Sequence, residues 1–337
     1  MNNKSTHEFY MSRCIEVAKK GIGTTYPNPC VGCIIVYKNT IISEAYSSKH
    51  GENHAEINAI NKIKNKEKLK KSTLYVTLEP CSHFGKTPPC CIAISNHQIP
   101  KVVIGTVDNS SKVNGKGIKE LEKNNIDVEF GILEKECKEL HKKFLCFNKN
   151  KRPYYILKWA QSEDKFISPI NNSTNEPFWI SSKHSRQLVH KWRSKENAIL
   201  VGYNTVINDN PNLNVRDWKG KNPTRIIIDL ENQLEDHYNV FNDQAKTIKI
   251  TKNDIDLYSS SVFEISNFLF KKNIQSVIVE GGKKTLDQFI KNDLWDEARI
   301  FTSDKKIKKG LEAPKIKGKI ILIKQIGSDK LKVLKPF

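Results

Sequence analysis

The sequence has no apolar run long enough to cross a membrane. Its longer apolar stretches, such as residues 31–37, fall far short of the ~20 residues that a membrane-spanning helix needs. Residues 1–8 also lack the apolar core of a signal peptide. We therefore expect a soluble, cytoplasmic protein that has no membrane partner.

Low-complexity segments and internal repeats are missing as well. With 16 glycines and 13 prolines in 337 residues, no fibrous or linker-like class fits. Hydrophobic residues make up 38% and charged residues 28% of the chain, which excludes a disordered protein. At roughly 150 residues per domain, the length predicts two domains with ordinary cores.

Acidic residues are scarce, because 37 Asp and Glu stand against 56 Lys and Arg and give a formal net charge of +19. Such an excess fits a nucleic-acid-binding protein, but it also fits a lysine-rich composition spread over solvated surfaces. Lysines are scattered along the chain, and no basic stripe contains interleaved aromatic residues. We therefore expect no nucleic-acid partner. A phosphorylated small substrate would also favour a basic site.

Cysteine is absent from the second half of the chain. The eight cysteines are Cys14, Cys30, Cys33, Cys81, Cys90, Cys91, Cys137 and Cys146. A secreted disulfide scaffold would be short and would carry a signal, so reduced thiols, some of them metal ligands, fit better. The asymmetry supports two domains with different chemistry.

Apolar periodicity predicts alternating helices and strands, which is typical of α/β layer folds. In the first half we expect helices at 9–20, 54–64 and 91–96, and strands at 31–37, 40–45, 74–78 and 101–106. In the second half we expect strands at 154–160, 198–201, 225–229 and 276–280. The polar, basic run 146–153 is the predicted linker. It divides the chain into domains 1–147 and 148–337.

The strongest chemical signal is His54-Ala-Glu56, followed by Cys81 and, nine residues later, Cys90. One imidazole and two thiolates suit tetrahedral Zn²⁺ and leave its fourth position to a water molecule, whose pKa zinc lowers towards neutrality. Glu56 would take the water proton and pass it to a leaving amine. His-x-Glu with a later Pro-Cys and a second Cys is the signature of zinc-dependent nucleobase deaminases.

The geometry of this cluster sets one condition. His54 begins an apolar-periodic segment, and residues two apart on a helix do not share a face. His54 and Glu56 can therefore converge only if the metal lies over the helix end. Cys90 follows two prolines and opens a helix, whose dipole helps to hold a thiolate.

The sequence offers two other possible sets of metal ligands. A structural zinc site would have four closed ligands, and Cys91 could be the fourth, although adjacent cysteines rarely bind one metal without strain. Cys30 and Cys33 have C-x-x-C spacing, but no second pair follows, and they run directly into the strand at 34–37. We expect neither metal nor redox chemistry from this pair.

The second half carries a weaker signal, because no G-x-G-x-x-G fingerprint follows a strand there. The remaining candidate is Gly281-Gly282, between the strand at 276–280 and a helix. Glycines at such a turn let backbone N–H groups approach a phosphate at the helix N-terminus. Many such turns, however, carry glycine for steric reasons alone.

The first half resembles the deaminase half of the bifunctional riboflavin-biosynthesis deaminase–reductases. The residues that carry this resemblance are 75–90, with Pro27-Asn-Pro29, Val31-Gly32 and 51–56. The eight residues between the two zinc cysteines are a mark of the riboflavin branch. The resemblance implies an α/β/α domain with a cytidine-deaminase-like fold.

The resemblance also implies roles for particular residues. His54, Cys81 and Cys90 would hold Zn²⁺, and Glu56 would be the proton donor. Asn28 would contact the substrate pyrimidine, and Lys86 would face the ribose phosphate. The family usually has a histidine seven residues before the zinc histidine, where this chain has Ser47, and His50 is close but out of register.

The second half is similar to the reductase half of the same family, which has a dihydrofolate-reductase-like α/β fold and uses NADPH. Its matching residues are 157–162, 179–180, 198–202, 205–206, 209–211, 213, 216 and 280–282. The implied NADPH-binding residues are Ala160, Trp179, Thr205, Asp209, Gly281, Gly282, Lys283, Lys284, Thr285, Leu286, Asp287 and Gln288.

The implied substrate-binding residues of the reductase half are Arg193, Leu213, Arg216 and Glu280. Two arginines suit a sugar phosphate, because guanidinium groups bind phosphate oxygens bidentately. Two positions depart from the family: the glycine of its Ser-Leu-Asp-Gly turn is Lys165, and the substrate-contacting serine before the Trp is Pro177.

The resemblance implies a bifunctional enzyme of riboflavin synthesis. It would deaminate a phosphorylated pyrimidine, a diaminopyrimidinone ribosylamino phosphate, with zinc, and would reduce the ribosyl chain to ribityl with NADPH. Because the family tends to associate, we expect a homo-oligomer. Three alternatives remain: a deaminase with a degenerate reductase half, a nucleic-acid-editing deaminase, and a non-catalytic zinc-binding module.

Overall fold

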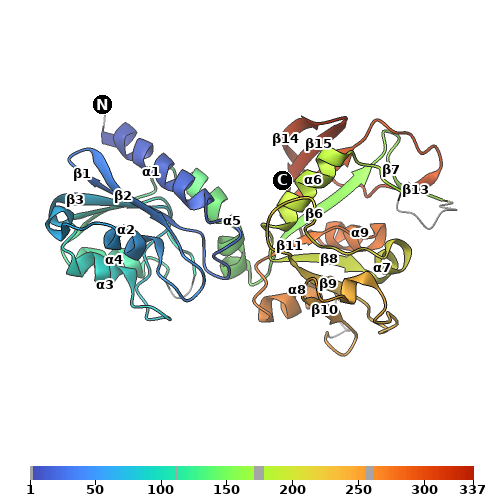
Figure 1. Ribbon diagram of the computed structural model, residues 1–337, viewed down its shortest axis with the longest axis horizontal. Coiled ribbons are helices and arrows are strands. Elements are labelled where there is room, and N and C mark those ends of the chain that lie inside the picture. The colour runs from blue at the N-terminus through green and yellow to red at the C-terminus, as the bar shows by residue number, and fades with distance from the viewer. Residues whose placement is uncertain (1–2, 111–112, 171–177, 256–260) are drawn as a thin grey trace. The chain divides into compact units, whose positions relative to one another are not determined.

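The computed structural model describes residues 3–110, 113–170, 178–255 and 261–337. The chain divides into two units, residues 1–151 and 152–337, each built around its own β-sheet (Figure 1). The expected fold class, two α/β domains, is confirmed. Among the described helices, none is both long and apolar enough to reach across a lipid bilayer.

The first unit has a five-stranded mixed sheet with the order β2-β1-β3-β4-β5. Strands β3, β4 and β5 run parallel, and β1 is antiparallel to both of its neighbours. In chain order the elements are α1 (Asn3–Lys19), β1 (Gly32–Tyr37), β2 (Thr40–Tyr46), α2 (Ala55–Asn61), the 3-10 helix η1 (Lys66–Lys71), β3 (Ser72–Val76), α3 (Cys90–Asn96), β4 (Lys101–Ile104), α4 (Lys116–Lys123), β5 (Asp127–Phe130) and α5 (Glu134–Asn150).

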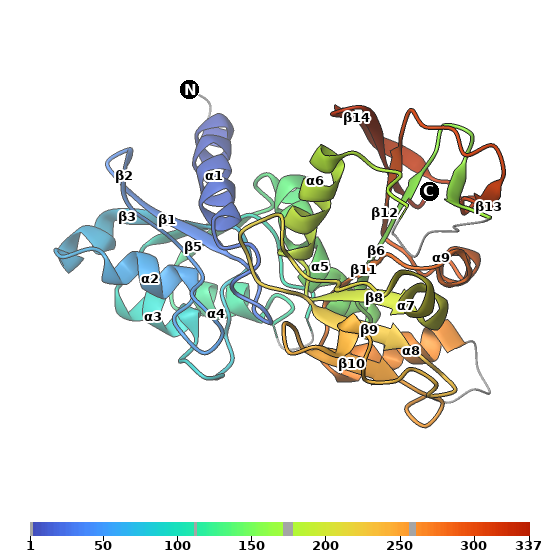
Figure 2. The same cartoon turned by 45° about the vertical axis from the view of Figure 1, so that its right-hand side comes forward.

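Both faces of this sheet are buried. Ile34 and Val36 of β1 pack with α1 and the beginning of α5 on one face, whereas Cys33 and Ile35 pack with α2, α3 and α4 on the other. Figures 1 and 2 show α1 on one side of the sheet and α2 to α4 on the opposite side. Burial on two faces explains why β1 is apolar without alternation, and it produces three layers.

Helix α5 continues through most of the predicted linker. The linker was expected to begin at residue 146, but α5 ends at Asn150. Phe144 and Leu145 pack against an apolar cluster and Phe147 is buried, so the inner face of the helix remains apolar while its outer face is rich in Lys and Asn. The expected start of the linker is therefore wrong. Lys151, at φ +54°, ends the helix in a left-handed conformation.

The second unit has an eight-stranded sheet with the order β10-β9-β8-β11-β6-β12-β15-β14, and a small sheet of β13 and β7. Strands β10, β9, β8, β11, β6 and β12 run parallel to one another. Strand β15 is antiparallel to β12, and β14 is antiparallel to β15. The elements are β6 (Tyr154–Gln161), β7 (Phe166–Pro169), α6 (Lys183–Arg193), β8 (Ala198–Gly202), α7 (Tyr203–Asp209), β9 (Thr224–Ile228), η2 (Asn239–Phe241), β10 (Thr247–Ile250), α8 (Ser261–Lys271), β11 (Ser276–Val279), α9 (Lys283–Lys291), β12 (Glu297–Thr302), β13 (Gly310–Glu312), β14 (Lys319–Ile326) and β15 (Asp329–Lys335).

Helices cover both faces of the large sheet. The main apolar cluster joins α8 and α9 to one face, and two smaller clusters join α6 and α7 to the other. Strands β8 and β11 are neighbours, and each leads directly into a helix, α7 and α9 respectively. The carboxyl edge of these parallel strands is where ligands of open α/β sheets bind.

Candidate active sites

Three side chains that can bind a metal ion converge in the first domain. The ligand atoms of His54, Cys81 and Cys90 lie within 4.8 Å of one another. His54 Nδ1 is 3.5 Å from Cys81 Sγ and 3.3 Å from Cys90 Sγ. Within the described parts of the chain, this is the one such group of three or more His, Cys, Asp or Glu side chains.

The ends of two helices bring these side chains together. His54 precedes α2 in an extended conformation, with φ −71° and ψ 167°, whereas Glu56 lies in the first turn of the helix. The cluster therefore lies over the helix end, as the two-residue spacing requires. Cys90 is the first residue of α3, and its backbone amide donates to Cys81 Sγ at 3.3 Å.

The protonation of Cys81 suits a metal ligand. The hydrogen bond from the Cys90 thiol, supported by one from His54, lowers the pKa of Cys81 to about 4. The thiolate is the form of cysteine that binds metal ions. A donor set of one imidazole and two sulfur atoms fits Zn²⁺ and leaves a coordination position open.

Glu56 has the properties of a proton-transfer group. Its side chain is only 3% exposed, and its Oε2 atom has no hydrogen-bond partner among the described residues. Burial raises the pKa of Glu56 above its ordinary value. A buried carboxyl group with an unused oxygen beside a metal cluster fits a missing water or substrate partner.

Two predicted substrate residues, Asn28 and Lys86, lie near the loop that contains His50 and Gly51. The Nδ1 atom of His50 is 3.2 Å from Oδ1 of Asn28, and Lys86 lies over Gly51, where an added Cβ would approach its Cδ to 3.5 Å. Ser47, which stands at the position of the family's histidine, is buried, and its hydroxyl accepts a backbone hydrogen bond. His50, and not Ser47, therefore contacts Asn28.

Sequence reasoning gave no role to Glu79, two residues before Cys81. Its buried carboxylate accepts hydrogen bonds from four backbone amides, those of Asp108, Gly115, Gly117 and Ile118, at 2.8–3.3 Å. Glu79 thus connects the loop before α4 to the segment that carries Cys81. Its place in the Glu-Pro-Cys string was the only available signal.

The other cysteines take no part in the metal cluster. The Cys91 thiol points to the carbonyl oxygens of Pro80 and Gly117, each 3.5 Å away. Cys33 is fully buried in β1, and the Cys30 thiol donates to the carbonyl of Ala18 at 2.8 Å. Cys91 is therefore not a fourth ligand.

In the second domain, Glu280 follows β11 and is a buried carboxylate surrounded by cations. Arg193 donates to both of its oxygens at 2.9 Å, and Lys158 Nζ lies 3.4 Å from Oε2. Burial alone would raise the pKa of Glu280, but the charges of Arg193 and Lys158 outweigh burial and hold it at about 2. The structure thus brings two predicted substrate residues, Arg193 and Glu280, into direct contact.

The other two predicted substrate residues lie in the segment after α7. Leu213 is buried and has φ +50°, whereas Arg216 is exposed. Arg193 donates a further hydrogen bond to the carbonyl of Asn214, at 3.1 Å. This bond connects the segment to the Arg193–Glu280 pair. In the part of the chain that the structure describes, the Arg216 guanidinium has no hydrogen-bond or ion-pair partner.

The predicted glycine turn connects β11 to α9. Gly282 has φ +63°, and a Cβ on Gly281 would lie 2.7 Å from Val201 Cβ and 2.9 Å from Thr205 Oγ1. Glycine is therefore required here by close approach and by backbone conformation. Thr205 and Thr285 both lie at this turn, because an added Cβ on Gly282 would lie 3.2 and 3.9 Å from their Oγ1 atoms.

The remaining predicted cofactor residues are more dispersed. Lys284 and Gln288 are exposed on α9, Lys283 pairs with Asp287 at 2.7 Å, and Leu286 packs in the main core. Asp209 ends α7. Ala160 lies in β6, and Trp179, 46% exposed, lies under the Arg186 guanidinium at 4.4 Å. Neither Ala160 nor Trp179 makes a described polar or ring contact with the glycine turn.

Of the two departures in the reductase half, Lys165 and Pro177, the structure describes only Lys165. Lys165 has φ +69°, and its amide still donates to the carbonyl of Ser162 at 3.1 Å. The turn therefore keeps the left-handed conformation that glycine adopts without strain. Pro177 lies outside the described residues.

Comparison with known proteins gives the same division of the chain. Residues 4–106 match the family described as the cytidine and deoxycytidylate deaminase zinc-binding region, and residues 153–307 match the RibD C-terminal domain. These matches agree with the deaminase domain and the riboflavin-family reductase domain expected for the two units. The first match is a zinc-binding region, and Zn²⁺ is accordingly the cofactor of the first domain.

Similar proteins span the whole chain. The riboflavin biosynthesis protein RibD of Aquifex aeolicus is 39% identical over 90% of this chain and 88% of its own length, and that of Escherichia coli is 32% identical over 88% of each. A solved structure from Thermotoga maritima, described as a diaminohydroxyphosphoribosylaminopyrimidine deaminase/5-amino-6-(5-phosphoribosylamino)uracil reductase, is 35% identical, covers 100% of both chains and has a TM-score of 0.91. The chain therefore belongs to the RibD family of bifunctional enzymes, which combine a zinc-dependent deaminase and a reductase in riboflavin biosynthesis.

Proposed function

We propose that the first domain hydrolytically deaminates 2,5-diamino-6-(5-phosphoribosylamino)pyrimidin-4-one and that the second reduces the ribosyl chain of the product to ribityl. The relative from Thermotoga maritima bears the names of these two activities. That similarity, together with the charge and position of this chain's own side chains, supports the same substrate for this chain.

In the deaminase site, His54, Cys81 and Cys90 hold Zn²⁺, and Glu56 moves the proton. The observation that carries this assignment is the unpartnered Oε2 of the buried Glu56, next to the ligand cluster. Because burial raises its pKa, the Glu56 carboxyl holds a proton more readily than an exposed glutamate does, and it can deliver that proton to the leaving amine. Asn28 orients the pyrimidine, and the Lys86 ammonium faces the ribose phosphate.

In the reductase site, Arg193, Leu213, Arg216 and Glu280 hold the substrate. Because the Arg193 guanidinium is paired with Glu280, the unpaired and exposed guanidinium of Arg216 is the better phosphate ligand. Of the residues named for NADPH, Thr205, Gly281, Gly282 and Thr285 lie together at the carboxyl edge of β8 and β11 and would hold the cofactor there. The cofactor supplies the hydride, and the protein positions the sugar against it.

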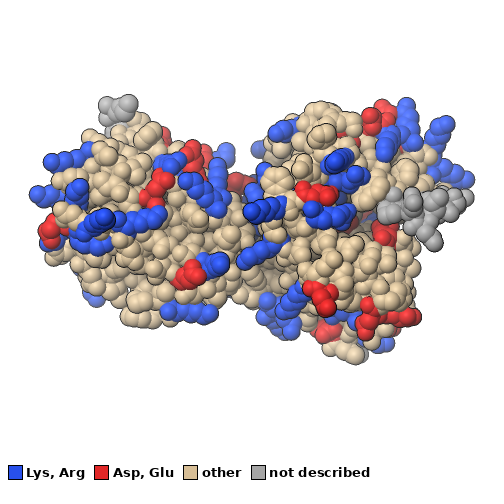
Figure 3. All heavy atoms as spheres, in the orientation of Figure 1, with Lys and Arg blue, Asp and Glu red and all other residues tan. Residues whose placement is uncertain are grey.

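We further propose a cytoplasmic homo-oligomer with no nucleic-acid partner. Strand β14 forms an edge of the large sheet, and Ile320, Ile321, Leu322 and Ile323 are 45–53% exposed. An apolar edge strand of this kind favours pairing with a second copy. Figure 3 shows Lys and Arg scattered over the visible face, with Asp and Glu among them. Such a distribution does not favour a nucleic-acid-binding stripe.

A variant of Glu56 tests the assignment of the two half-reactions. Glu56→Gln should lower ammonia release from the diaminopyrimidinone substrate by about 10²–10⁴-fold, because it removes proton transfer. The same variant should still oxidise NADPH when the deaminated intermediate is supplied directly. Glu52→Gln is the matched control, because Glu52 is exposed just before the same helix. Wild-type rates of deamination in Glu56→Gln would refute the proposed role.

A further inference from the structure

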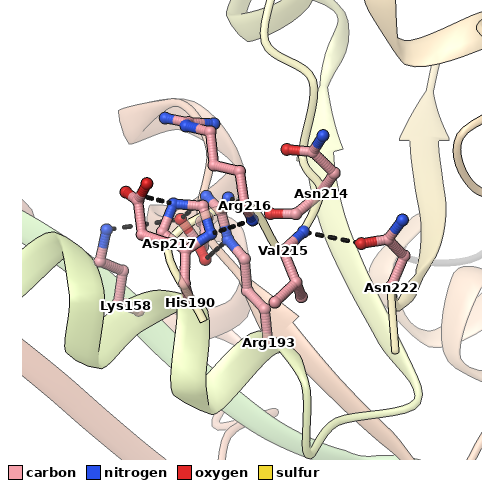
Figure 4. A network of polar contacts seen from close by, with 9 residues as sticks. Lys158, His190, Arg193, Asn214, Val215, Arg216, Asp217 and Asn222 are labelled. Carbon is pink, nitrogen blue, oxygen red and sulfur yellow. Dashed lines mark hydrogen bonds and ion pairs between the residues drawn. The ribbon is translucent and has the colours of Figure 1, made fainter. Parts of the chain in front are cut away.

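His190 is a buried histidine that the proposed chemistry does not use. It lies in α6 three residues before Arg193, so the two side chains share one face of the helix. Its side chain is only 2% exposed. Figure 4 shows His190 and Arg193 pointing to the segment that carries Asn214, Val215 and Arg216. This segment contributes the proposed phosphate ligand.

Three hydrogen bonds hold the main chain of this segment. Arg193 donates to the carbonyl of Asn214 at 3.1 Å, and the amide of Val215 donates to Oδ1 of Asn222 at 2.7 Å. The amide of Arg216 donates to Nδ1 of His190 at 3.2 Å. His190 is therefore the side chain that binds the backbone of Arg216 itself.

These contacts determine the tautomer of the imidazole. A backbone amide can only donate, so Nδ1 of His190 must carry a lone pair and not a proton. The ring proton of the neutral form then lies on Nε2, which is 3.5 Å from Oδ2 of Asp217. Burial, together with the charges of Arg193 and Arg216, lowers the pKa of His190 to about 4. The imidazole is therefore neutral and able to accept at neutral pH.

We propose that His190 is a positioning residue of the reductase site, which holds the backbone of Arg216 so that its guanidinium meets the substrate phosphate. The inference rests on the proposed function, because it takes Arg216 as a phosphate ligand. His190 itself is directed to protein atoms on both of its ring nitrogens. It therefore acts on the substrate only through Arg216.

Steady-state kinetics of the full chain test this role. His190→Ala should raise the KM for the phosphorylated aminouracil intermediate by about tenfold, the loss expected for one hydrogen bond, with a smaller change in kcat. The KM for NADPH and the deaminase rate should not change. His190→Asn should be closer to wild type, because the Asn oxygen can accept from the Arg216 amide. His184→Asn is the control, since His184 lies exposed on the same helix.

A double-mutant cycle separates positioning from general damage. In an Arg216→Ala background, His190→Asn and His190→Ala should add no further increase in KM, because the residue through which His190 acts is gone. Additive effects, or an equal rise in the KM for NADPH, would overturn the inference. A wild-type enzyme that reduces no intermediate at all would instead refute the proposed function, so the two failures are distinguishable.

Discussion

Arg193 and Glu280 face each other through two parallel hydrogen bonds of 2.9 Å, and the side chain of Glu280 is only 6% exposed. A bidentate pair of this kind has defined geometry as well as charge. It connects helix α6 to the end of β11, next to the glycine turn. The proposed substrate side and the proposed cofactor side of the reductase site therefore share one buried ion pair.

Glu280→Gln should destabilise the second domain by about 3–5 kcal/mol at neutral pH, because it leaves Arg193 and Lys158 buried without their counter-charge. Urea unfolding followed by tryptophan fluorescence measures this domain alone. All five tryptophans lie in the second unit, at Trp159, Trp179, Trp192, Trp218 and Trp295. Glu231→Gln, an exposed carboxylate in the same unit, should have little effect.

The effect of Glu280→Gln should depend on pH. The folded-state pKa of Glu280, about 2, is lower than its ordinary value of 4.5, so its carboxylate stabilises the folded state fully above about pH 4.5. That contribution is lost as pH falls through about 2. The difference in unfolding free energy between wild type and variant should therefore shrink between these two pH values. A difference that stays constant would contradict an ionised, paired Glu280.

Two adjacent cysteines give a matched pair for the metal site. Cys90→Ser should lose bound zinc, because a weakly acidic hydroxyl replaces a thiolate ligand. Cys91→Ser should keep its zinc, because the Cys91 thiol contacts only carbonyl oxygens, which a hydroxyl can also reach. Elemental analysis of the purified variants measures both. Equal zinc loss from the two proteins would argue against the assigned ligands.

Glu79→Gln should loosen the loop before α4. Both oxygens of the Glu79 carboxylate accept from backbone N–H groups, whereas a Gln side chain has only one oxygen that can accept. Some of these N–H donors would lose their partner, and each unpaired donor costs about 1–3 kcal/mol. We expect faster hydrogen exchange at the amides of Gly115, Gly117 and Ile118. Glu122→Gln, on the exposed side of α4, is the control. Unchanged exchange would mean that the four bonds do not hold the loop.

Lys165→Gly should stabilise the second domain. A non-glycine residue at φ +69° costs about 1–2 kcal/mol relative to the right-handed conformation, and glycine avoids most of this cost. The urea midpoint by tryptophan fluorescence should rise. Lys315→Gly should instead lower the urea midpoint, because Lys315 has no positive φ and glycine only adds conformational freedom to the unfolded chain. A lower midpoint for Lys165→Gly would contradict this interpretation of the turn.

The strands were largely predictable because burial on two faces leaves continuous apolar runs, as at Cys33–Val36 in β1 and Ile226–Ile228 in β9. The ends of the helices and their buried faces were harder to predict. In the first helix, Phe9 is 68% exposed, whereas its neighbours Tyr10 and Met11 are buried. The helix also begins six residues earlier than expected, at Asn3. Local periodicity does not determine which side of a helix meets a sheet.

The metal cluster was predictable because its residues form a spaced motif, and the two-residue separation of His54 and Glu56 required a helix end between them. Glu79 and His190 were not predictable in the same way. Their partners are backbone amides of loops distant in sequence, at residues 108–118 and 216. Amide hydrogen bonds of this kind depend on loop conformation and leave no pattern of residue types.

A product assay on the diaminopyrimidinone ribosylamino phosphate tests the central claim most directly. Mass spectrometry of reactions with zinc-loaded protein, with and without NADPH, distinguishes each step. We predict that the deaminated compound accumulates alone and becomes the ribityl compound when NADPH is added. Deamination that stops there despite NADPH would contradict the proposed activity of the second domain, and no turnover of this substrate would contradict the proposed function of both.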